Sequence, residues 1–125
     1  MPLPPTGTCE MSTRGRRSGR TRRVEIWYVV VEGTIVLTGI PGARHWLANL
    51  RAHPEAVLRL REPAGDLEVV AEEVTDPGTR RRIAEQAWLL QPWYAAQPYS
   101  IDDWVRGSPM VTLAPSASSP CERVR

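Results

Sequence analysis

The sequence predicts a mainly β domain with helices (α+β), in which two antiparallel hairpins contribute to a closed or nearly closed small barrel. Residues 23–31 form an apolar, β-branched run, and Glu32-Gly33 turns the chain back into a similar run at residues 34–38. A second hairpin is expected from residues 56–61 and 67–74. Because short turns join these strands, they should pair antiparallel, which favours a barrel over a parallel sheet.

Periodicity and chain breakers predict the other elements. These are helices over residues 43–52 and 79–90, an aromatic-rich loop over residues 91–100, a helical turn over residues 101–105 and a last strand over residues 110–113. Asp76 is expected to cap the second helix and Ser100 the helical turn, because short polar side chains accept hydrogen bonds from free amides at helix starts. The arginine cluster at residues 80–82 is expected on the solvated face of the second helix.

The length of 125 residues fits one domain. We expect an extended lead-in over residues 1–10, the barrel domain over residues 11–115 and a frayed C-terminal tail over residues 116–125. No apolar run reaches the roughly 20 residues of a transmembrane helix and no secretory leader is visible, so a cytoplasmic protein is expected. All 16 basic residues are arginine and phenylalanine is absent, which points to a GC-rich bacterial genome.

The residues that usually carry catalysis or bind metals are isolated in this sequence. Cys9 and Cys121 lie near opposite ends without metal-ligand spacing, so two free thiols and no metal site are expected. His45 and His53 have no partner at catalytic or metal-ligand spacing, and we interpret both as structural. The residues alone therefore indicate no catalytic side chain.

A basic turn at residues 13–23 is the strongest functional feature. Six arginines occupy its last ten positions, separated only by Gly, Ser and Thr. Glycines allow left-handed backbone, so successive N–H groups can converge on a phosphate, with Arg16, Arg17 and Ser18 adding charged and hydroxyl contacts. Three interpretations stay open: an exposed loop, a nucleic-acid contact and a cradle for a cofactor phosphate. No second basic surface matches the turn, which argues against nucleic acid.

A second feature is the glycine-containing loop at residues 39–44, which leads into the first helix. Free amides at a helix start attract anions. Trp46 and Asn49 are three residues apart and share a helix face. They can hold a planar heterocycle, or they can be a core tryptophan beside a solvated asparagine. A further set of aromatic residues packs a core by default, but can also line a pocket for a flat apolar substrate; it comprises Trp88, Trp93, Tyr94, Tyr99 and Trp104.

Three blocks in order resemble the deazaflavin-dependent nitroreductase family of flavin/deazaflavin oxidoreductases. Residues 13–23, followed by a strand with Trp27-Tyr28, resemble the signature T-x-G-R-[KR]-S-G-x-x-R. Residues 46–54 match W-x-x-N-L-x-x-x-P, and residues 106–110 match R-x-x-P-hydrophobic. The resemblance covers about residues 11–115 and implies the split β-barrel of pyridoxamine-phosphate-oxidase-like, FMN-binding proteins.

The resemblance implies coenzyme F420, an 8-hydroxy-5-deazaflavin with a phosphate and a polyglutamate tail, bound in the barrel groove. The implied contacts to phosphate and tail are Arg16, Arg17, Ser18 and Arg22. The loop flanking the cofactor would contribute Gly42, Ala43 and Arg44. Trp46 and Asn49 would contact the tail and the ring side. The implied substrate wall comprises Trp27, Tyr94, Tyr99 and Trp104.

The implied activity is hydride transfer from reduced F420 to a small hydrophobic acceptor such as a quinone, a nitroaromatic or an enone. The alternatives are an FMN-using reductase on the same scaffold and a non-catalytic cofactor-binding protein. A homodimer is a possible assembly. The sequence departs from the family pattern at Glu25, where an apolar residue or proline is usual, so Glu25 is expected to orient or reject a ligand.

Overall fold

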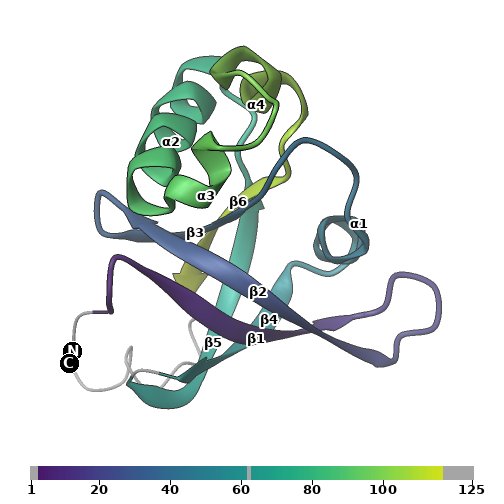
Figure 1. The fold of residues 1–125 in the computed structure, drawn as a ribbon. Coiled ribbons are helices and arrows are strands. Elements are labelled where there is room, and N and C mark those ends of the chain that lie inside the picture. Colours follow the sequence, from purple (N-terminus) through teal and green to yellow (C-terminus); the bar gives the residue numbers. More distant parts are fainter. Residues whose placement is uncertain (1–2, 62, 117–125) are drawn as a thin grey trace.

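The barrel is closed by six antiparallel strands in a computed structural model that describes residues 3–61 and 63–116 (Figure 1). Around the barrel the order is β1-β2-β3-β6-β5-β4. The strands are β1 Thr6–Arg14, β2 Thr21–Val31, β3 Thr34–Thr38, β4 Glu55–Arg61, β5 Ala64–Glu73 and β6 Met110–Pro115. The helices are α1 His45–Ala52, α2 Pro77–Leu90, α3 Pro92–Ala95 and α4 Ile101–Gly107. The predicted α+β barrel is therefore confirmed.

Two expected boundaries were wrong. Strand β1 begins at Thr6, so residues 6–10 belong to the barrel wall instead of a lead-in. The reason is its partner: β1 pairs residue by residue with the long strand β2, from Thr6 opposite Val29 to Arg14 opposite Thr21. Within the expected loop at residues 91–100, Pro92 starts the short helix α3. Of the expected tail at residues 116–125, Ser116 donates its amide to the carbonyl of Glu68 at 2.9 Å, and residues 117–125, including Cys121, lie outside the described residues.

The wall of the barrel separates two hydrophobic cores. Along β2 the side chains alternate, so Tyr28 and Val30 pack inside the barrel while Val29 and Val31 pack outside it. Helices α2, α3 and α4 gather over this outer face (Figure 1). Helix α1 adds its apolar face to the inner core. Among the described residues, no helix is long and apolar enough to cross a membrane.

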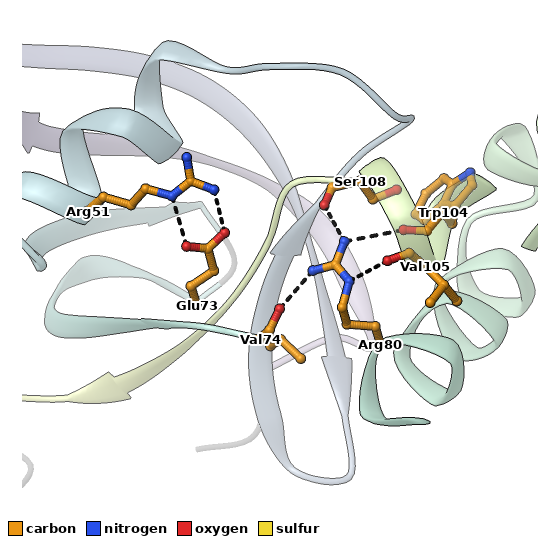
Figure 2. A network of polar contacts seen from close by, with 7 residues as sticks. All are labelled: Arg51, Glu73, Val74, Arg80, Trp104, Val105 and Ser108. Atoms are coloured by element: carbon orange, nitrogen blue, oxygen red, sulfur yellow. Dashed lines mark hydrogen bonds and ion pairs between the residues drawn. The ribbon is translucent and has the colours of Figure 1, made fainter. Parts of the chain in front are cut away.

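An ion pair ties α1 to β5 on the surface of the barrel. Arg51 donates through Nε and Nη2 to the two carboxylate oxygens of Glu73, at 2.8 and 2.6 Å (Figure 2). The hydrogen bonds from Arg51 hold the pKa of Glu73 below its ordinary value of 4.5. Because the folded pKa is the lower one, the pair contributes stability above about pH 4.5, and this contribution is lost as the pH falls through the folded pKa.

We therefore expect Glu73→Gln to lower the free energy of unfolding at pH 7 by up to about 1 kcal/mol, the usual limit for an exposed pair. The difference from the wild type should shrink as the pH falls below 4.5. Urea unfolding of both proteins at pH 7 and at pH 3 measures it. A difference that stays constant, or grows in acid, would contradict the assignment.

Candidate functional site

A groove of about 630 Å³ lies between the basic turn and α1. The turn connects β1 to β2 and projects from the barrel on the side of α1 (Figure 1). Of the predicted cofactor contacts, the groove is lined by Arg16, Arg17, Ser18, Arg22, Arg44, Trp46 and Asn49. The structure thus brings together two sequence features that are more than twenty residues apart.

Glycine and serine give the basic turn its shape. The amide of Gly15 donates to the carbonyl of Arg20 at 2.8 Å, and the amide of Gly19 donates to the carbonyl of Gly15 at 3.0 Å. Gly19 has φ of 71°, in the left-handed region that favours glycine. Ser18 Oγ accepts from the amide of Arg20 at 3.1 Å. The amide of Arg16 donates to Oδ1 of Asn49 at 3.1 Å. Among the backbone amides of residues 15–20, those of Arg17 and Ser18 therefore have no acceptor within the described residues.

The groove is cationic because its arginines are not neutralised. Among the described residues, no acidic side chain lines it, and none of its arginines (Arg16, Arg17, Arg22, Arg23 and Arg44) forms an ion pair. By contrast, six arginines elsewhere are each paired with an acid: Arg51, Arg59, Arg61, Arg81, Arg82 and Arg106. Like charges held together without counter-charges attract an anionic ligand.

Arg44 reaches the groove from the loop before α1. Its guanidinium donates to the carbonyls of Ile40, at 2.9 Å, and Ala43, at 3.2 Å. A Cβ on Gly42 would lie 3.2 Å from Nη1 of Arg44, and Gly42 itself has φ of 140°. Gly42 and Ala43 do not line the groove but line a second hollow of about 700 Å³. The carbonyl of Ala43 accepts from Arg44, and Gly42 leaves room for its guanidinium.

Trp46 and Asn49 are both buried, and both also line the groove. Trp46 is 8% exposed and belongs to the inner core, yet its surface also forms part of the groove wall. Asn49 is 5% exposed, so the structure excludes the alternative of a solvated asparagine. Its side chain faces the basic turn, where it bonds with Arg16 and Thr13.

The predicted substrate wall does not form at this groove. Trp104 is fully buried and Tyr94 is 5% exposed; their rings meet edge-on at 4.9 Å in the outer core. Packing among α2, α3 and α4 takes up both side chains, and their contact with a substrate stays a prediction from the family resemblance. Tyr99 packs against the same core, and Trp27 is exposed on the outer face of β2. Neither lines the groove.

Glu25 also lies elsewhere. Its carboxylate pairs with Arg61 across the outer face of the barrel, and Glu25 does not line the groove. Because side chains alternate along β2, Glu25 points away from the side that Val24 shares with the groove, and its effect on a ligand stays a prediction. The charged side chains around Glu25 form a surface ladder of ion pairs.

Sequence reasoning missed several residues of the groove. His45 lines it, with Nδ1 at 3.5 Å from Nη2 of Arg16, although a lone histidine gave no functional signal. Arg23 and Val24 also line it, because they belong to the first residues of β2 that follow the turn. The sequence did contain a signal for Val24, because it is an apolar residue that directly follows the pair Arg22-Arg23 at the start of a strand.

Comparison with known proteins settles the family. The family model of the F420H2-dependent quinone reductases matches residues 3–104. The chain belongs to this family. It is therefore an F420-dependent oxidoreductase, as the sequence blocks implied.

Solved structures share the fold of this F420-dependent reductase at low identity. A conserved hypothetical protein from Mycobacterium tuberculosis is 21% identical, with a TM-score of 0.64 over 86% of this chain and 72% of the other. An F420-H2-dependent reductase is 20% identical, with a TM-score of 0.61 over 86% and 93%. An FAD-binding protein from Mesorhizobium loti is 12% identical, with a TM-score of 0.60 over 87% and 80%. No curated protein matches the sequence significantly.

The residues of the groove fit the chemistry of F420. A phosphate and several carboxylates require cationic and N–H donors, and the groove offers unpaired arginines, two free amides and the Ser18 hydroxyl. A planar deazaflavin requires an apolar surface, which Trp46 and Val24 provide. The groove therefore offers both the hydrogen-bond donors and the apolar surface that F420 requires.

Proposed function

We propose that this reductase binds F420 in the cationic groove and reduces a small hydrophobic acceptor, with a quinone as the first candidate and a nitroaromatic or an enone as the others. The observation that carries the proposal is the set of unneutralised arginines around a groove with an apolar wall. When bound in its reduced form, F420H2, the coenzyme would supply the hydride and be oxidised to F420.

The side chains of the groove divide into binding and orienting roles in this proposal. Arg16, Arg17 and Arg22 neutralise the anionic tail, and the amides of Arg17 and Ser18 donate to its phosphate. Trp46 forms an apolar wall that excludes water from one side of the ring. Holding the cofactor at both its charged and its apolar ends restricts its position relative to a substrate.

Fluorescence titration with F420 and, separately, with FMN tests the choice of cofactor. F420 should bind at micromolar protein, and FMN more weakly, because FMN carries one phosphate and no glutamates. FMN is a fair competitor because an FAD-binding protein shares the fold. Oxidation of F420H2, followed by absorbance with a naphthoquinone or a nitroaromatic as acceptor, then tests the acceptor class. Binding of neither cofactor would refute the proposal.

The assembly and location of the protein stay predictions from the sequence and the family resemblance. We propose a homodimer in the cytoplasm of a bacterium, built from the barrel domain, whose first strand begins at Thr6. Size-exclusion chromatography with light scattering measures the mass directly. A monomeric mass at working concentration would remove the dimer from the proposal.

A further inference from the structure

We infer that Asn49 is a positioning residue, which fixes Arg16 for the anionic tail of the cofactor and does not itself bind the cofactor. This inference rests on the proposed function, because it assumes that Arg16 contacts the tail. It replaces the direct contact that the family resemblance implied for Asn49.

The carboxamide oxygen of Asn49 is fully used within the protein, and one of the two N–H groups of its nitrogen is used as well. Its Oδ1 accepts from the backbone amide of Arg16 at 3.1 Å and from Nη1 of Arg16 at 3.1 Å. Its Nδ2 donates to Oγ1 of Thr13 at 3.4 Å. Asn49 is 5% exposed and Thr13 is 4% exposed, so water competes little for these bonds. One side chain from α1 therefore holds both the end of β1 and the start of the turn.

The hydrogen bonds between Asn49 and Arg16 reduce the conformational entropy that Arg16 would lose when it binds a ligand. An exposed arginine samples many rotamers, and ordering it on a ligand reduces affinity. Asn49 fixes the backbone of Arg16 and one arm of its guanidinium, while Nη2 lies 3.5 Å from Nδ1 of His45. Within the described residues, Nε of Arg16 has no acceptor and is available to an anion. The side chain is thus oriented before the cofactor arrives.

An amide performs this role better than a carboxylate would. Aspartate at position 49 could accept both bonds from Arg16, but it could not donate to Thr13. It would also pair with Arg16 and cancel a charge in a groove where no described arginine is otherwise paired. Asparagine orients the guanidinium and leaves its positive charge for the ligand.

A double-mutant cycle tests the inference. Dissociation constants of Asn49→Ala, Arg16→Ala and the double variant are measured for F420 and for a deazaflavin that lacks the phosphate and glutamates. Arg16→Ala should weaken F420 binding about tenfold or more, the range of one charged hydrogen bond. Asn49→Ala should weaken it less, and the double variant should bind like Arg16→Ala alone. Neither single variant should change the affinity for the tail-free compound.

The outcomes separate this inference from the proposed function. Additive losses in the double variant, or a loss of affinity for the tail-free compound in Asn49→Ala, would overturn the positioning role. Unchanged F420 affinity in Arg16→Ala would instead overturn the proposed tail contact. If Asn49→Ala does not fold, Asn49→Asp serves in its place. It should bind F420 more weakly than the wild type at equal thermal stability, and wild-type affinity would overturn the inference.

Discussion

Replacing Arg16 and Arg17 together by alanine should weaken F420 binding by at least about 100-fold, since each charged hydrogen bond contributes roughly 1.5–3 kcal/mol. Both side chains are exposed at the rim of the groove, so their removal leaves the core intact. Fluorescence titration of the variant measures the effect. Added salt should weaken binding to the wild type more than to the variant, because the lost interactions are electrostatic.

Arg81→Ala with Arg82→Ala provides the matched control. It removes the same charge from two adjacent exposed arginines, but these are paired with Asp102 and Glu32 and lie away from the groove. This variant should bind F420 like the wild type. Equal binding by the wild type and the Arg16/Arg17 variant would mean that the turn is only a solvated loop. Salt-sensitive retention on DNA that disappears in the same variant would favour a nucleic-acid contact.

Arg80→Met should lower the free energy of unfolding by about 3–5 kcal/mol, because buried acceptors lose their donor. The guanidinium donates to the carbonyls of Val105 at 2.7 Å, Val74 at 2.7 Å and Ser108 at 2.6 Å (Figure 2). Val105 has no helical alternative, since the residue four positions later is Pro109, which lacks an N–H. Arg80 therefore satisfies the end of α4.

Chemical denaturation of Arg80→Met and of Arg81→Met measures this difference. Both substitutions remove one positive charge from adjacent positions of α2. Arg81 is exposed and pairs with Asp102, so its loss should leave the unfolding midpoint nearly unchanged. A similar small change for Arg80→Met would show that water replaces the guanidinium at the three carbonyls.

Local signals predicted the hairpins and the helix caps correctly. Asp76 accepts from the amide of Thr79 at 2.8 Å, and Ser100 forms a reciprocal capping box with Asp103. These contacts span three residues, so the sequence contains both partners within one turn. The tight turn at Glu32-Gly33 likewise depends on neighbouring residues alone.

Contacts between distant elements were beyond local reasoning. Three adjacent arginines at residues 80–82 look equally solvated in the sequence, yet Arg80 is 8% exposed. A signal existed, because Arg80 shares the buried stripe of α2 with Ile83, Ala84 and Ala87. Its acceptors, however, are carbonyls in α4, just after β5 and just before β6, and only the packed fold brings these together.

For the candidate site too, the sequence predicted the location but not the role of each residue. The blocks shared with the family located the turn and α1, but they did not distinguish a residue that binds a ligand from one that supports it. Asn49 bonds to Arg16, and Gly42 leaves the space that the guanidinium of Arg44 occupies. Tyr94 and Trp104, assigned to a substrate by resemblance, fill a core because three helices converge on the outer face of the barrel.

The strand order means that the groove residues are synthesised before the strand that closes the barrel. Every residue that lines the cationic groove lies within residues 13–49, whereas β6, which joins β3 to β5, comes from residues 110–115. The groove is therefore synthesised well before the barrel can close. Until β6 appears, the nascent chain exposes the unpaired edges of β3 and β5, which are the sites where premature association would begin.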